Sequence, residues 1–186
     1  YSESIYLEAK YGKASFMNDV QANMNGAMNA QGPLYLNDIS SVNSIFNYNR
    51  SYAKGAIVLH MLRGVLGDDN FFKVMRTYHD KPAFRYGVVT TEDFQGVCEE
   101  VSGNSLDYFF REWVYGENYP RYNIGWNQSL VPGTNKYKLL LRLKQTSNSN
   151  PQFFTMPFEL KIGFGSGRDT IVTAFNSSQE EVFEFF

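Results

Sequence analysis

Apolar residues recur at helical spacing along residues 1–120. One apolar stripe ends before Gly67 and comprises Val58, Met61, Leu62, Val65 and Leu66. After it, Asp68 can cap a helix whose stripe is Phe71, Val74, Met75 and Tyr78. Side chains three and four positions apart lie on one face of a helix, so both stripes predict amphipathic helices with a buried face.

Two further helices are expected before residue 120. Thr90 or Thr91 can cap the first, and Glu92 and Asp93 suit its positive N-terminal end. Gly103 is suited to end it, because glycine tolerates the left-handed conformation that follows many helices. Ser105 can cap the second of these helices. The apolar faces of the two are Phe94, Val97, Cys98 and Val101, and Leu106, Phe109, Phe110 and Trp113.

The N-terminal segment "YSESIYLEAKYG" predicts a helix from the first residue, without a capping residue ahead of it. Residues 13–29 predict a weaker helix that is rich in Asn and Met. Residues 30–50 are polar and predict a long loop, and loops of that length in compact domains are often functional.

After "GENYP" the hydrophobic period changes to two, which indicates strands. The alternating segments begin near Tyr122, Tyr137 and Phe154 and continue in "TIVTAF" and "EVFEFF", with the turn signals "VPGTN" and "GSGRD" between strands. Five short strands with one apolar face suggest a sandwich or barrel. The sequence therefore predicts an α+β chain, with a helical domain at 1–120 and a β domain at 121–186.

Composition narrows the function classes. Hydrophobic residues make up 43% of the chain, enough for a buried core, and the net charge is −2 without a basic block. Neither nucleic acid nor an anionic membrane surface is therefore indicated as a partner. No apolar run approaches the ~20 residues that span a bilayer. The single cysteine, Cys98, excludes an internal disulfide and leaves the compartment open.

The residues alone provide no complete active site. The two histidines, His60 and His79, lack the paired spacing of a zincin, and each is expected to have a structural or surface role. Ser166 in "GFGSG" follows a strand and lacks the nucleophile-elbow pattern. Cys98 lies on an apolar helix face, where a core thiol is expected. Carboxylates pair locally as helix caps and surface charges.

The segment "SYAKGAIVLHMLRGVLGDDNFFKVMRTY" resembles the zinc aminopeptidases of the aminopeptidase N and leukotriene hydrolase family. In that family a Tyr-x-Lys-Gly turn opens a helix, followed by Leu-Gly, a Phe-rich helix and a tyrosine. The resemblance continues through "TTEDF", "LDYFFREWVYGENYP" and a β-sandwich that begins at "RYNIGW". It implies the C-terminal helical part of a thermolysin-like catalytic domain, followed by a truncated antiparallel β-sandwich.

The resemblance also implies what lies outside this chain. The opening "YSESIYLEA" resembles the helix just after the family's "NEGFA", whose glutamate is the third zinc ligand. The HExxH helix and the Gly-Ala-Met-Glu-Asn segment of the family would precede residue 1. A start within a helix and an end within a strand agree with this expectation. No metal ligand is therefore expected in this chain, and zinc and peptide substrate are expected only for a longer protein that includes the missing N-terminal half.

In the family, the tyrosine of Tyr-x-Lys-Gly donates a hydrogen bond to the oxyanion formed when zinc-bound water attacks the scissile carbonyl. Here that tyrosine is Tyr52. A phenol has an ordinary pKa of about 10, so it is a neutral donor at working pH. Tyr48 and Arg50 are candidate pocket-lining, substrate-binding neighbours. The alternative is that Tyr52 has a purely structural role and packs at the start of a helix. Lys54 and Glu92 are expected to be structural.

The leading function is therefore a zinc aminopeptidase, to which this chain contributes the oxyanion-stabilising tyrosine. In the resemblance, Gly55 and Ala56 would let the metal-binding helices approach closely. The alternative, from another class, is a non-catalytic scaffold or interaction protein built on the same fold. A third possibility is that the sandwich binds carbohydrate or protein partners, although its strands carry no ligand signature.

Overall fold

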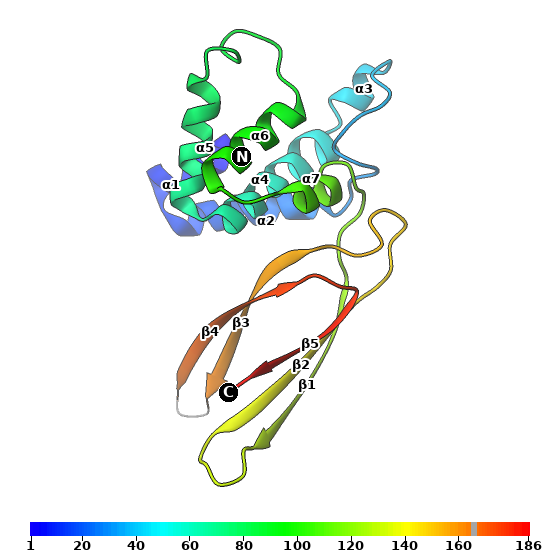
Figure 1. The fold of residues 1–186 in the computed structure, drawn as a ribbon. Coiled ribbons are helices and arrows are strands. Elements are labelled where there is room, and N and C mark those ends of the chain that lie inside the picture. The colour runs from blue at the N-terminus through cyan, green and yellow to red at the C-terminus, as the bar shows by residue number, and fades with distance from the viewer. Residues whose placement is uncertain (165–166) are drawn as a thin grey trace. The chain divides into compact units, whose positions relative to one another are not determined.

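The computed structural model describes residues 1–164 and 167–186, so Gly165 and the Ser166 considered above lie outside the described residues. The chain forms two compact units, Tyr1–Asn118 and Tyr119–Phe186. The first is helical and the second consists of antiparallel strands (Figure 1). The predicted α+β class is confirmed.

The helical unit follows the predicted stripes closely. Its elements are α1 (Ser2–Tyr11), α2 (Lys13–Ala27), α3 (Val42–Ile45), the π-helix η1 (Tyr48–Lys54), α4 (Gly55–Leu66), α5 (Asp68–Asp80), α6 (Thr91–Ser102) and α7 (Asp107–Trp113). The expected loop at 30–50 thus contains one short helix and the start of η1. Across residues 1–164 and 167–186, no helix combines the length and apolarity that a membrane crossing requires.

The helix ends agree only in part with the predicted capping residues. Thr90, not Thr91, is the N-cap of α6: its hydroxyl accepts from the N–H of Asp93, whose carboxylate accepts from the N–H of Thr90. Gly103 ends α6 in the left-handed region, at φ 71°. Asp68 does not cap α5, because its carboxylate binds Arg63 instead. Nor is Ser105 the N-cap of α7, which Leu106 precedes without a side-chain cap.

The core of the helical unit is formed by large apolar side chains from α4 to α7. The side chains that are almost fully buried there are Leu62, Phe71, Val74, Val97, Cys98 and Phe109. Full burial of a Leu, Val or Phe side chain stabilises a fold by about 1.5–3 kcal/mol. These residues belong to the predicted stripes, so the helical period and the core agree.

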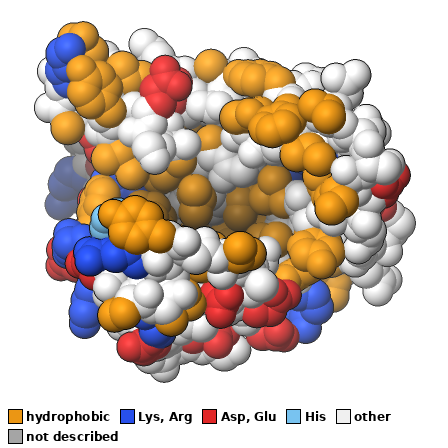
Figure 2. All heavy atoms as spheres, turned by 90° about the horizontal axis from the view of Figure 1, so that it is seen from above, with side chains coloured by type: hydrophobic (Ala, Val, Ile, Leu, Met, Phe, Trp, Pro, Cys, Tyr) orange, Lys and Arg blue, Asp and Glu red, His pale blue; other side chains and the backbone are white. Residues whose placement is uncertain are grey.

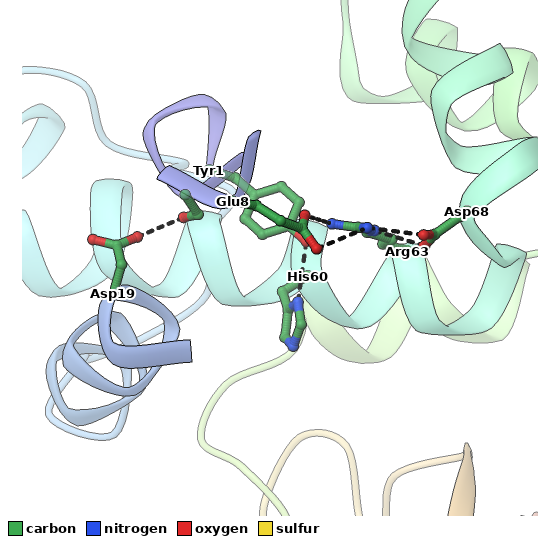
Figure 3. A network of polar contacts seen from close by, with 7 residues as sticks. Tyr1, Glu8, Asp19, His60, Arg63 and Asp68 are labelled. Atoms are coloured by element: carbon green, nitrogen blue, oxygen red, sulfur yellow. Dashed lines mark hydrogen bonds and ion pairs between the residues drawn. The ribbon is translucent and has the colours of Figure 1, made fainter. Parts of the chain in front are cut away.

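A polar network joins α1, α4 and α5 on one side of this core (Figure 3). Arg63 of α4 lies 2.6 Å from a Glu8 carboxylate oxygen and 2.7 Å from an Asp68 carboxylate oxygen. The Tyr1 hydroxyl and His60 Nδ1 share a hydrogen bond of 3.1 Å. His60 is thus held in a helix-packing contact, and burial lowers its pKa.

The β unit contains two antiparallel sheets. Its strands are β1 (Tyr122–Leu130), β2 (Tyr137–Gln145), β3 (Met156–Phe164), β4 (Arg168–Asn176) and β5 (Glu180–Phe185), in the orders β1-β2-β5 and β3-β4. Phe158 of β3 and Phe183 of β5 pack edge to face, with ring centroids 5.2 Å apart. Half-buried aromatic side chains from the two sheets therefore pack against each other, as a sandwich requires.

Candidate functional site

The three predicted site residues, Tyr48, Arg50 and Tyr52, lie on one short π-helix, η1. The Asn47 side chain starts this helix by accepting a hydrogen bond of 3.0 Å from the backbone N–H of Arg50. The backbone N–H of Ser51 donates to the carbonyl of Asn47 over 2.8 Å. π-Helical turns are rare and occur often at functional sites, so the backbone alone marks this segment.

Tyr52 faces away from the core. Its residue surface is 52% exposed, whereas the next two residues, Ala53 and Lys54, are 0% and 6% exposed. The apolar and cationic side chains that follow it are therefore held inside the fold while the phenol stays accessible. An accessible hydroxyl can meet a reacting group, and a buried one could not.

Tyr48 and Arg50 differ in their surroundings. Tyr48 is 61% exposed on the same turn as Tyr52. The guanidinium of Arg50 folds back onto Ser44, whose backbone carbonyl and hydroxyl both accept from its Nη2. Arg50 Nε is buried without a hydrogen-bond partner among the described residues. Arg50 thus ties α3 to η1, and its role in lining a substrate pocket stays a prediction.

Within this chain, the close backbone approach beside Tyr52 occurs at Gly26, whereas the expected approach of the metal-binding helices to Gly55 and Ala56 stays a prediction. A Cβ placed on Gly55 would meet only Leu34 Cδ2, at 3.9 Å, which is ordinary contact. A Cβ placed on Gly26 would lie 2.8 Å from the Cβ of Ala53. Within the described residues, α2 and η1 therefore meet at Gly26 and Ala53. The contact is possible because residue 26 has no side chain and residue 53 has only a methyl group.

Lys54 is buried directly behind Tyr52. Its Nζ donates to the carbonyl oxygens of Gly32 and Gly116, each over 3.2 Å. Burial lowers the pKa of Lys54 to about 8, while the negative charge of Glu117 opposes the shift. The lysine is a structural anchor, as the sequence predicted. Its two partners come from distant loops and were not predictable.

Glu92 and Cys98 also have structural surroundings. The Tyr115 hydroxyl donates a hydrogen bond to the Glu92 carboxylate, which lowers the pKa of that carboxyl. Cys98 is fully buried, and burial raises the pKa of its thiol to about 12. A thiol in this state is a poor nucleophile, because the thiolate is the reactive form.

An apolar cavity of ≈ 380 Å³ lies on the inner side of α4. Its wall is formed by Leu34, Gly55, Val58, Leu59, Leu62, Tyr78, Val89, Thr90, Thr91, Phe94, Phe109, Phe110 and Val114. Figure 2 shows a hollowed face on which hydrophobic side chains gather at the floor and the rim. Tyr48, Arg50 and Tyr52 are outside this wall, so the exposed phenol and the cavity are separate features.

The described residues do not provide a zinc site. Among residues 1–164 and 167–186, no group of three His, Cys, Asp or Glu side chains could hold a metal ion. His60 shares a hydrogen bond with Tyr1, and His79 lies in the last turn of α5. The donor set needed for zinc does not fit the residues present here.

Comparison with known proteins identifies the family. Residues 2–113 match the Peptidase family M1 domain, which is more than half of the chain. The chain belongs to peptidase family M1. The match contains α1 to α7, including the whole η1 turn with Tyr52 and Lys54. The resemblance that the ordered motifs indicated is therefore confirmed.

Individual M1 relatives agree with this assignment. The chain is 38% identical over 81 residues to Aminopeptidase M1-D of Oryza sativa subsp. japonica, and 33% identical over 79 residues to Aminopeptidase N of Lactococcus lactis subsp. lactis. These matches cover 44% and 42% of this chain and 9% of each relative. It is also 25% identical over 138 residues to Aminopeptidase A of Gloydius brevicauda, covering 74% of this chain and 14% of that relative. The chain thus spans a small part of the length of the M1 relatives it matches.

Proposed function

We propose that this chain is part of a zinc-dependent aminopeptidase that hydrolyses N-terminal residues from peptides, and that Tyr52 is its oxyanion-stabilising residue. The observation that carries the proposal is the placement of Tyr52. It is the tyrosine of a Tyr-x-Lys-Gly turn, it lies within the M1 match, and its side chain is accessible on a firmly held π-helix.

The chemistry requires a hydrogen-bond donor. When water adds to a peptide carbonyl, the carbonyl oxygen becomes an oxyanion in the tetrahedral intermediate. A phenolic O–H placed there donates to that oxygen more strongly than to the ground-state carbonyl, because the negative charge has developed. One such donor contributes about 2.7–4 kcal/mol to the transition state. In this role Tyr52 would donate a hydrogen bond and keep its proton.

In this proposal, the other groups of the active site lie outside the 186-residue chain. The described residues contain no cluster that could bind zinc, so the metal ligands and the general base would come from outside this chain. The 186-residue chain by itself is therefore expected to be inactive as a peptidase. Tyr48 would contact the substrate near Tyr52, because both side chains are exposed on η1.

The test is Tyr52→Phe in the full-length protein, which removes one oxygen and keeps the ring. We expect kcat for an aminoacyl-anilide substrate to fall by about 10²–10³, with zinc content unchanged. Tyr137→Phe is the matched control, because Tyr137 has a similar exposure on β2. Unchanged turnover for Tyr52→Phe would reject the role. A wild-type protein with no peptidase turnover at all would favour the scaffold alternative.

A further inference from the structure

We propose that Lys54 is a positioning residue for the reaction: its buried ammonium group fixes η1 so that the Tyr52 hydroxyl is held at the site of the reacting carbonyl. The inference rests on the function proposed above, and it concerns a residue whose side chain points away from the accessible phenol. Lys54 touches no substrate in this proposal and acts only through Tyr52.

The first support is the direction of the two side chains. Residues two positions apart on a helix do not share a face. Tyr52 is accessible and Lys54 is buried, on the same π-helical turn. Holding the Lys54 side chain inside the fold therefore sets the rotation of the turn. A turn rotated far enough to release Lys54 would carry the phenol toward the protein interior.

The second support is what the ammonium group binds. Gly32 lies in the loop after α2 and Gly116 lies after α7, and both carbonyls accept from the same Nζ. These two segments are also joined to each other. The backbone N–H of Tyr35 donates to the carbonyl of Val114 over 3.1 Å, and the rings of Tyr35 and Tyr115 lie 5.0 Å apart. Lys54 therefore attaches η1 to an anchor that is itself cross-linked.

The third support is the packing of Ala53, the residue between Tyr52 and Lys54. Ala53 is fully buried against Gly26, where α2 and η1 leave no room for an added methyl group. Lys54 and Ala53 thus restrain the turn against two different parts of the fold. A displacement of about 1 Å at a catalytic group can cost 10²-fold in rate, so restraints of this kind matter for turnover.

Burying an ammonium group costs more free energy than filling the same volume with an apolar side chain. Burial disfavours the charged form, and carbonyl partners only partly offset the loss of water. An uncharged chain of the same length would fill the volume but would leave the two carbonyls without this donor. The geometry therefore favours a role that needs directed hydrogen bonds, and positioning of the adjacent catalytic turn is such a role.

The experiment is a double-mutant cycle in the full-length protein with an aminoacyl-anilide substrate. Lys54→Met keeps the length of the side chain and removes the donors. In the wild-type background we expect kcat to fall at least about tenfold with little change in KM. In the Tyr52→Phe background we expect Lys54→Met to change kcat less than about twofold, because the group it positions has been removed.

A second readout does not depend on activity. Hydrogen exchange of the backbone amides of η1 is expected to become faster in Lys54→Met than in wild type. Lys73→Met on the exposed face of α5 is the matched control and is expected to change neither kcat nor exchange in η1. If Lys54→Met does not fold, Lys54→Gln carries the same cycle, since its amide can still donate to a carbonyl and should retain more turnover.

The two proposals fail in different ways. If Tyr52→Phe lowers kcat but Lys54→Met gives the same loss in both backgrounds, or gives none, the positioning role is overturned and the role of Tyr52 stands. If Tyr52→Phe leaves kcat unchanged, the proposed function is rejected at its first step. Unaltered exchange in η1 of Lys54→Met also overturns the positioning role.

Discussion

A methyl group on Gly26 would lie 2.8 Å from the methyl group of Ala53, which is closer than real side-chain contacts. Helix α2 and the turn that carries Tyr52 therefore meet where only a hydrogen atom fits. The same added carbon would lie 3.4 Å from Tyr48 Cε1. The contact with Ala53 therefore requires that residue 26 lack a side chain, whereas the approach to Tyr48 is an ordinary contact distance.

Gly26→Ala is expected to destabilise the helical unit by about 1–3 kcal/mol, because backbone or Ala53 must move to relieve the overlap. Gly64→Ala is the control. A Cβ on Gly64 meets nothing within 4 Å, and alanine favours a helix over glycine by about 1 kcal/mol. Urea unfolding of the 186-residue chain measures both. A Gly26→Ala chain as stable as wild type would show that the contact relaxes freely.

Arg63→Met is expected to lower the free energy of unfolding by about 1–2 kcal/mol. Its guanidinium is mostly buried and binds the carboxylates of both Glu8 and Asp68. Arg76→Met, at an exposed position of α5, serves as the control and should be nearly neutral. Equal unfolding midpoints for the two variants would contradict a stabilising network around Arg63.

Lys54 should give the stability a recognisable pH dependence. Burial lowers its pKa from the ordinary value of 10.5 to about 8, with the charge of Glu117 opposing the shift and that of Arg50 adding to it. Between these two pH values the unfolded chain binds more protons at Lys54 than the folded chain. The contribution of Lys54 to stability therefore increases with pH across that window, by at most about 1.4 kcal/mol per pH unit.

Unfolding of wild type and Lys54→Met at about pH 7 and about pH 10 isolates this contribution, because titration of the other groups cancels to a first approximation. Wild type should gain stability relative to Lys54→Met at the higher pH. A constant difference between the two proteins would show that the ammonium group has an ordinary pKa.

Cys98 should be inert in the folded chain. It is fully buried and the pKa of its thiol is raised to about 12, so thiolate is scarce at neutral pH. Reaction with a thiol reagent is expected to be slow in buffer and to become fast in denaturant. Rapid labelling of the folded chain at neutral pH would contradict the burial.

Sequence periodicity predicted the helices because the residues that are buried on one face of a helix recur at the helical spacing along the chain. The stripes around Leu62, Phe71 and Val97 follow from the helical repeat, and they became the core. The predicted cap at Asp68 failed because a tertiary partner binds its carboxylate, and the predicted cap at Ser105 failed because α7 begins one residue later, after Leu106. For Asp68, that partner is Arg63. Cap propensity alone cannot register such partners.

The site was predictable only as a motif. Tyr52 and Lys54 were identifiable from the Tyr-x-Lys-Gly pattern, but the contacts that hold them were not. Gly26 carried no signal, because a glycine in a polar, Asn-rich helix has the same pattern whether or not another backbone lies against it. Likewise, the acceptors on Gly32 and Gly116 are backbone carbonyls, which every residue has, so no residue pattern in the sequence marks them. Long-range backbone partners are set by the fold.

The bond between Lys54 and Gly116 has a practical consequence for chimeric proteins. Gly116 lies just before the helical unit ends at Asn118. A fusion that exchanges the sandwich for another module should place its junction after Asn118. A junction a few residues earlier would replace the residues that place this carbonyl next to the ammonium group. Such a hybrid would keep Tyr52 and Lys54 but would hold the η1 turn less firmly.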